Sequence, residues 1–137
     1  MNKIFIDCEF DGFGGPLISM GLVNPDGREF YEVVDHDPIK DSWVMENVIP
    51  ILHKESVPYD EFQERLYHWL KPQYPFTLIA DWPDDIRYFL ESIMTGPGSM
   101  MDFNSLHFEV HRRWLLTKES AILHNAWSDA RAIMQCY

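Results

Sequence analysis

The sequence predicts a single α/β domain, residues 1–137, built around a mixed β-sheet. Three strand-like segments separated by short turns open the chain, an order that is typical of an antiparallel meander. Amphipathic helical patterns follow and are interrupted by at least one more strand. The chain has the length of one ordinary domain, and 46% hydrophobic residues are enough for a core that needs no disulfides.

The first three predicted strands are Lys3–Glu9, Leu17–Val23 and Arg28–Val34. Residues of the first strand alternate between two faces. One face carries Ile4, Ile6 and Cys8, and the other carries Lys3, Phe5, Asp7 and Glu9. The second strand is a continuous apolar run, which indicates burial on both faces. The sequence NPDG between the second and third strands has the composition of a tight turn.

Helical periodicity begins after the third strand. Ser42 is the expected N-cap of a short helix through Ile49, and Pro58–Leu70 is a clearer amphipathic helix. Phe76–Ala80 is a short apolar strand, and Pro83 suits the first turn of the helix that follows it. The expected buried stripes are Phe62, Leu66, Trp69 and Leu70 on one helix and Ile86, Phe89, Leu90 and Ile93 on the other.

The segment Asn104–Lys118 fits two structures, because its apolar spacing suits a helix whereas the run LHFEV alone suits a strand. As a helix it would bring His107 and His111 one turn apart, a spacing seen in zinc sites, although no third ligand is evident nearby. A final helix begins near Asn125. Its expected buried face comprises Ala126, Ala130, Ile133 and Met134.

The composition argues against several classes of protein. Eleven basic and 22 acidic residues give a net charge of −11, which disfavours binding of duplex nucleic acid through a broad basic surface. Bound metal ions can still reverse the field at a local site. No apolar run approaches the roughly 20 residues of a membrane span, and the N-terminus turns acidic before a signal-peptide core forms. We therefore expect a cytoplasmic protein with Cys8 and Cys136 as reduced thiols.

Asp7 and Glu9 on the first strand are the first candidate metal ligands. Strand residues i and i+2 share a face, so their carboxylates lie a few ångströms apart. Two such charges repel each other, and aspartate is depleted in strands. Carboxylate oxygens are hard ligands that suit Mg²⁺ or Mn²⁺. The pair alone favours a solvated strand end, so a metal site needs further ligands from other segments.

Two helix starts supply such ligands. Asp84 and Asp85 lie in a first helical turn, where the helix dipole favours negative charge. On a helical wheel Asp84 lies about 170° from the apolar stripe and Asp85 about 90° from it, so we expect Asp84 in solvent and Asp85 at the site. At the last helix, Asn125 is the expected N-cap, Asp129 lies on the flank, and His124 lies in the preceding loop.

Together these motifs resemble the DEDDh 3′–5′ exonucleases, a superfamily with the ribonuclease H-like fold. The matching elements are Asp7-x-Glu9 on the first strand, Asp85 after the fourth strand, and His124-x4-Asp129 near the C-terminus. The segments PLISMGLVNPDGREFYEVV, DSWVMENVIPIL and HNAWSDARA are similar to a small bacterial 3′–5′ exoribonuclease group. The resemblance covers nearly the whole chain and implies a three-strand meander followed by a parallel strand, with helices on both faces.

The resemblance also implies a chemistry, the metal-dependent hydrolysis of phosphodiester bonds at the 3′ end of single-stranded nucleic acid, with RNA preferred. Two Mg²⁺ or Mn²⁺ ions would stabilise the attacking and leaving oxygens. Their implied ligands are the carboxylates of Asp7, Glu9, Asp85 and Asp129. His124 would be the general base for the attacking water. Phe10 would either stack on the terminal base or pack in the core.

The family's usual asparagine, four residues before the middle aspartate, is Asp81 in this chain, which favours Asp85 over Asp84 as that aspartate. The implied partners are single-stranded RNA or short oligonucleotides, with DNA as an alternative and no membrane. A homodimer is one alternative for the oligomeric state.

Two rival functions stay open at this point. The net charge of −11 suits a non-catalytic acidic interaction protein that mimics nucleic acid. A mimic needs carboxylates spread along one face, whereas the candidate ligands come from three distant segments. A phosphatase or an internally cutting nuclease would use the same two metals.

Overall fold

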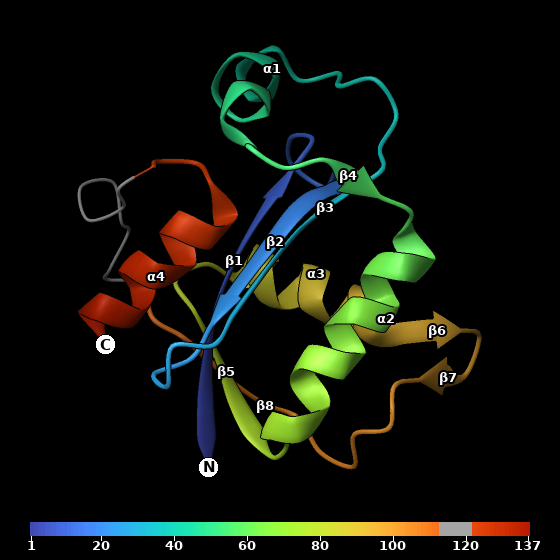
Figure 1. Ribbon diagram of the computed structural model, residues 1–137. Helices are drawn as coiled ribbons and strands as arrows, with labels where there is room; N and C mark the ends of the chain where they lie inside the picture. The colour runs from blue at the N-terminus through green and yellow to red at the C-terminus, as the bar shows by residue number, and fades with distance from the viewer. Residues whose placement is uncertain (113–121) are drawn as a thin grey trace.

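A six-stranded mixed sheet forms the centre of the structure, a computed structural model that describes residues 1–112 and 122–137 (Figure 1). The strand order is β4-β3-β2-β1-β5-β8. The strands are β1 (Asn2–Phe10), β2 (Leu17–Val23), β3 (Glu29–Val34), β4 (Ser56–Val57), β5 (Phe76–Ala80) and β8 (His107–Val110). The first three form an antiparallel meander, and β5 and β8 run parallel to β1. The predicted α/β class and the meander are therefore confirmed.

Helices cover both faces of this sheet (Figure 1). One face packs against α2 (Tyr59–Leu70) and α3 (Pro83–Ile93), and the other packs against α4 (Ala126–Cys136). A short helix, α1 (Ser42–Asn47), and a 3₁₀ turn, η1 (Ile49–Ile51), cover one end of the sheet. The remaining elements are the 3₁₀ turn η2 (Lys71–Gln73) and the small hairpin of β6 (Met94–Gly96) and β7 (Ser99–Met100).

β1 is buried on both sides, and its alternation decides where its carboxylates point. Ile4, Ile6 and Cys8 belong to the core under α2 and α3, whereas Phe5 packs with α4. Because strand residues alternate, Asp7 and Glu9 share the face of Phe5. The predicted division of this strand is confirmed, and both acidic side chains lie on the α4 side of the sheet.

Gly21 decides how closely α4 approaches the sheet. It lies on β2 opposite Asp7 of β1. A Cβ atom at this position would come within 2.4 Å of the carbonyl oxygen of Ala126. A glycine here therefore lets the first turn of α4 lie against β2. This close approach brings the start of α4, with His124 before it and Asp129 within it, beside the acidic end of β1.

Two helices differ in detail from the prediction. The N-cap of α1 is Asp41 rather than Ser42, because Asp41 has extended backbone and its side chain accepts a hydrogen bond of 3.0 Å from the amide of Val44. The buried side chains of α3 are Asp85, Tyr88, Phe89, Ser92 and Ile93. The predicted Ile86 and Leu90 are only partly buried, so the inner face of α3 is rotated toward Asp85.

The segment Asn104–Lys118, which fitted either a helix or a strand, contains a strand: His107–Val110 forms β8 at the edge of the sheet. A strand rises about 3.3 Å per residue, so His107 and His111 lie about 13 Å apart rather than one helical turn apart. His111 contacts Glu109 instead, at 2.8 Å. The suggested zinc pair is therefore wrong, and residues 113–118 of this segment lie outside the described residues.

The helices of residues 1–112 and 122–137 include none that is long and apolar enough to cross a lipid bilayer.

Candidate metal centre

The carboxyl ends of β1 and β5 bring acidic side chains together at one edge of the sheet. Phe5 pairs with Ile79 across these parallel strands, so Asp7 and Asp81 each lie two residues further along. Helix α3 begins soon after β5 and contributes Asp85. One carboxylate oxygen from each of the three aspartates lies within 4.8 Å of the others. This spacing allows the three side chains to bind one cation.

A second group forms where α4 begins. Ligand atoms of Glu9, His124 and Asp129 all lie within 4.8 Å of one another. Asn125 caps the helix by accepting a hydrogen bond of 3.1 Å from the amide of Ser128. The carboxylate of Asp129 accepts a hydrogen bond of 3.1 Å from the amide of His124. The capped helix start therefore holds the imidazole and this carboxylate next to β1.

The backbone of His124 has a φ of 67°, in the left-handed region that few non-glycine residues adopt. Such conformations cost on the order of 1 kcal/mol and persist where the surroundings hold them. Here the hydrogen bond from the His124 amide to Asp129 and the cap of α4 hold the loop. The strained residue is thus the one whose ring lies beside Glu9.

The five predicted catalytic and metal-binding residues, Asp7, Glu9, Asp85, His124 and Asp129, all fall within these two groups. Asp81 was not among the predicted ligands, although it occupies the position of an asparagine in the DEDDh pattern. Two signals point to Asp81: it follows β5 directly, and the parallel register places it level with Asp7.

Asp85 is buried, and Asp7 and Glu9 are partly buried beside other carboxylates. Burial raises the pKa of Asp7 and of Asp85 well above their usual range, and neighbouring carboxylates, Asp85 for Asp7 and Asp81 for Asp85, raise these pKa values further. Burial, followed by the charges of Asp129 and Asp85, raises the pKa of Glu9 to about 9. Within the described part of the chain, no ion pair includes Asp7, Glu9 or Asp85.

The donor set fits divalent cations. The Oδ2 atom of Asp7 is buried and has no hydrogen-bond partner among the described residues. A buried carboxylate oxygen in this condition is costly unless a cation is bound next to it. The group of Asp7, Asp81 and Asp85 offers only oxygen ligands, which suit Mg²⁺ or Mn²⁺. In the other group the nitrogen of His124 is a ligand that Mg²⁺ seldom takes, so with Mg²⁺ this imidazole is available as a base.

A groove of about 410 Å³ opens beside Glu9. Its aromatic lining comes from three segments of the chain and comprises Phe10, Phe13, Trp43 and Trp82. Phe13 is 96% exposed, and Trp43 and Trp82 are each nearly half exposed. Phe10 stacks on Tyr88 at 4.7 Å and also lines the groove, so both of its predicted roles are compatible with its position.

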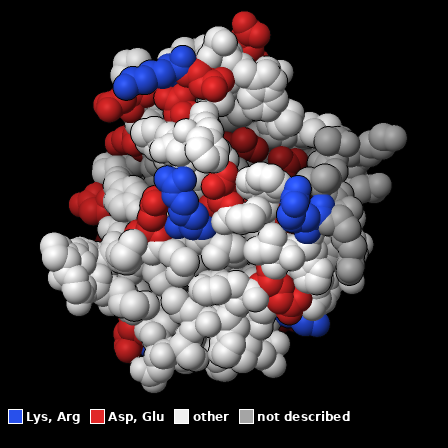
Figure 2. Space-filling view, turned by 180° about the vertical axis from the view of Figure 1, so that it is seen from behind, with Lys and Arg blue, Asp and Glu red and all other residues white. Residues whose placement is uncertain are grey.

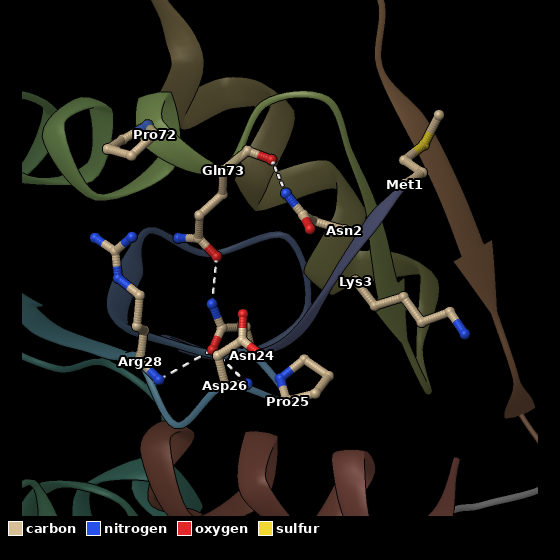
Figure 3. A pocket seen from close by; sticks show the side chains of 9 residues that line it. All are labelled: Met1, Asn2, Lys3, Asn24, Pro25, Asp26, Arg28, Pro72 and Gln73. Atoms are coloured by element: carbon tan, nitrogen blue, oxygen red, sulfur yellow. Dashed lines mark hydrogen bonds between the residues drawn. The ribbon is translucent and has the colours of Figure 1, made fainter.

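A second cavity, of about 340 Å³, lies at the opposite end of β1 (Figure 3). Two of its side chains, Asn24 and Gln73, are buried, and Asn24 Nδ2 donates to Gln73 Oε1 at 2.6 Å, while the exposed Asn2 donates from Nδ2 to the backbone carbonyl of Gln73 at 2.7 Å. The side chains of Lys3 and Arg28 point to different sides (Figure 3). These residues close the amino-terminal end of the sheet and form no convergent charged site.

Comparison with models of known protein families finds none that matches this chain, and comparison with curated proteins finds no match. A functional assignment therefore depends on the residues of the acidic centre and its groove.

The metal-free protein is expected to lose stability as the pH rises. The pKa values of Asp7, Glu9 and Asp85 are raised in the folded state, so folding favours their protonated forms. That stabilisation is complete below the unfolded pKa and is lost as the pH rises through the folded pKa. For Glu9 this window runs from its ordinary value of 4.5 to about 9.

Thermal melting in EDTA should therefore show a melting temperature that falls between about pH 5 and pH 9. Added Mg²⁺ or Mn²⁺ should raise the melting temperature most at the alkaline end, because metal binds the deprotonated ligands. The Asp7→Asn variant should show a shallower fall. A melting temperature that rises with pH in EDTA would contradict the electrostatics of this centre.

Proposed function

We propose that this protein is a metal-dependent 3′–5′ exonuclease of single-stranded nucleic acid, with a ribonuclease H-like fold and a preference for RNA. The observation that carries the proposal is the convergence of five predicted residues at one edge of the sheet. They are Asp7, Glu9, Asp85, His124 and Asp129. The same residues, in the same order along the chain, form the motifs that resemble the DEDDh exonucleases.

The chemistry follows from the two groups of ligands. Two bound divalent ions would stabilise the attacking and leaving oxygens of an in-line displacement at phosphorus. His124 accepts a proton from the attacking water, and its backbone amide, bonded to Asp129, holds the loop that carries the ring. The water oxygen bonds to phosphorus, the bond from phosphorus to the 3′ oxygen breaks, and this oxygen takes a proton from solvent water. A mononucleotide leaves, and the shortened chain keeps a 3′ hydroxyl.

The groove supports a substrate with unpaired bases. Exposed aromatic rings bind bases through their faces, and this mode needs a single strand. Trp82 donates a hydrogen bond of 3.1 Å from its indole nitrogen to Asp84, and the guanidinium of Arg112 lies 5.1 Å from the centre of the Trp82 ring. Arg112 thus places a cation beside the groove, where a phosphate of the substrate chain needs one.

The charged surface disfavours a duplex. On the face shown in Figure 2, Lys and Arg side chains form separate spots among Asp and Glu side chains. A protein that holds duplex DNA through its phosphates needs many such cations along one track. This face therefore offers no continuous basic track for a long double helix.

Burial argues against the non-catalytic alternative, an acidic protein that mimics nucleic acid. A mimic must present its carboxylates to a partner. Asp85 is only 3% exposed, and Asp7, Glu9 and Asp129 are each at least partly buried. These side chains lie close to one another in two groups, so their charge is directed at positions where a cation would bind.

The test is hydrolysis of 5′-labelled single-stranded RNA and of DNA of the same sequence, with Mg²⁺, Mn²⁺ or EDTA. We expect a ladder that shortens from the 3′ end with either metal, faster on RNA, and no products in EDTA. A blocked 3′ end should protect the strand. Absence of metal-dependent hydrolysis on either substrate would overturn the proposal, and rapid cutting of a closed circular strand would indicate an internal nuclease.

Asp85→Ala is expected to lower the rate of hydrolysis at least about 100-fold, because it removes a metal ligand. Asp84 is the matched control. It is partly buried rather than fully solvated, since it accepts the hydrogen bond of Trp82, but it belongs to neither group of ligands. Asp84→Ala should therefore keep kcat near that of the wild type, and any effect should appear in KM, because Asp84 bonds to Trp82 of the groove. The reverse order of the two variants would show that the middle ligand is assigned to the wrong residue.

A further inference from the structure

The loop after β1 is bonded to the segment that leads into α1. The carboxylate of Asp11 accepts hydrogen bonds from the backbone amides of Lys40, at 3.0 Å, and Asp41, at 2.9 Å. Asp11 lies two residues after Glu9, so a residue next to the acidic centre fixes the start of α1.

Asp41 links Asp11 to α1, because its amide donates to Asp11 and its side chain caps the helix. Its side chain accepts a hydrogen bond of 3.0 Å from Val44, which caps α1. Gly12 has a φ of 75°, and a Cβ atom there would lie 3.0 Å from Oδ2 of Asp41. The two loops are therefore in close contact, and the first turn of α1 is held against the end of β1.

The C-terminal end of the segment 41–52 bonds to β3 and to the start of α4. The carbonyl of Leu52 accepts a hydrogen bond of 2.6 Å from the hydroxyl of Tyr31. The carbonyl of Ile51 accepts one of 2.9 Å from Asn125, the N-cap of α4. Residues 41–52 thus bridge the end of β1 and the start of α4, the two elements that supply Glu9 and His124.

Trp43, in the first turn of α1, contacts the imidazole of His124. The ring centres are 4.7 Å apart and the ring planes meet at 79°, an edge-to-face contact. The imidazole makes no hydrogen bond with any side chain or backbone group in the described ranges 1–112 and 122–137. In the part of the chain that the structure describes, the imidazole thus lies between this indole and the carboxylates of Glu9 and Asp129, whose ligand atoms are within 4.8 Å of its own.

We propose that Asp11 is a positioning residue for His124 and that it acts through Trp43. Its carboxylate fixes the backbone at Lys40 and Asp41, the cap fixes the first turn of α1, and that turn fixes the indole against the imidazole. Without Asp11 the indole is no longer held, and the base is misaligned with the attacking water. The effect on hydrolysis rests on the proposed function, whereas the orientation of the ring does not.

The orientation can be measured on the metal-free protein by the NMR signals of the histidine ring protons. The His124 signal is assigned by its loss in His124→Gln. We expect the ring current of Trp43 to displace it, and Trp43→Ala to move it toward the position of an exposed histidine. Asp11→Ala should move it the same way, whereas Asp11→Asn should move it less, because its amide oxygen can still accept from Asp41 while its NH₂ group cannot accept from Lys40. Asp37→Ala, at an exposed aspartate of the same segment, is the control.

An unmoved His124 signal in Asp11→Ala would overturn the proposal. If this variant does not fold, Gly12→Ala provides the second measurement, because it crowds Asp41 and strains the backbone next to Asp11 while keeping the Asp11 carboxylate. It should displace the same signal, and an unmoved signal in that variant would overturn the proposal equally.

Kinetics give the second readout. Asp11→Ala should lower kcat about 10-fold through misalignment of the base. In the Trp43→Ala background, Asp11→Ala should lower kcat almost no further, because both substitutions remove the same support of the imidazole. Fully additive effects would contradict action through Trp43. If the wild type hydrolyses neither substrate, the proposed function fails while the NMR result still decides the positioning role.

Discussion

Replacing His124 with alanine is expected to lower kcat by about 10²–10⁴-fold while metal binding is retained. The reason is that a general base acts on the attacking water and does not need to bind the metal. An imidazole nitrogen of His124 lies within 4.8 Å of carboxylate oxygens of Glu9 and Asp129, so the three could share a cation. Mg²⁺, however, prefers oxygen ligands. Single-turnover hydrolysis with Mg²⁺ and titration calorimetry of Mg²⁺ binding measure the two effects separately.

His53→Ala is the matched control for this variant. His53 is exposed and has a φ of 55°, so its replacement also removes an imidazole from a left-handed position. It should leave both the rate and the metal affinity unchanged. If His124→Ala loses Mg²⁺ affinity in the calorimeter, the residue is a metal ligand and its role as the base is wrong.

The sequence predicted those parts of the fold that depend on local patterns. The alternation of β1 and the apolar runs of β2 and β5 are properties of consecutive residues, and the bounds of β2 and β5 match the prediction. The cap of α4 by Asn125 is also local and is confirmed. Asp41 as the cap of α1 was missed, because the choice between neighbouring capping residues depends on contacts with Asp11 from another loop.

The set of candidate metal ligands could be predicted only in part, because some of them are brought together by contacts between distant segments. Asp7 and Glu9 are two residues apart on one strand, so periodicity alone pairs them. Asp81 joins them only through the parallel register of β1 and β5, which no local pattern gives. Asp85 was expected on the flank of its helix, but it is buried and its Oδ1 accepts a hydrogen bond of 2.9 Å from the amide of Cys8. The rotation of α3 that produces this contact depends on packing between distant segments.

Asp7→Asn is expected to abolish hydrolysis and, in EDTA, to melt at a higher temperature than the wild type. Asp7 is central to the acidic cluster, because the charges of Asp85, Glu9 and Asp129 all act on it. Without metal, the folded wild type must either hold this buried charge or bind a proton to it, and both cost free energy. Asparagine has nearly the same shape and no charge, so it removes that cost.

The gain in stability should be on the order of 1 kcal/mol. For a chain of this size that corresponds to roughly 3–5 °C in melting temperature. The measurement is thermal melting at pH 8 in EDTA, followed by titration with Mg²⁺ or Mn²⁺. The wild type should gain stability by mass action as metal binds, and Asp7→Asn should gain much less.

Asp26→Asn is the control for a change of one charge, since Asp26 is exposed in the turn between β2 and β3. This substitution also removes one negative charge, but Asp26 lies at the other end of the sheet. We expect it to leave the melting temperature and the metal response close to those of the wild type. A rise in Asp7→Asn that Asp26→Asn does not show therefore comes from the cluster itself. If Asp7→Asn instead melts lower in EDTA and responds to metal as the wild type does, its carboxylate binds no cation, and the proposed nuclease loses its main physical support.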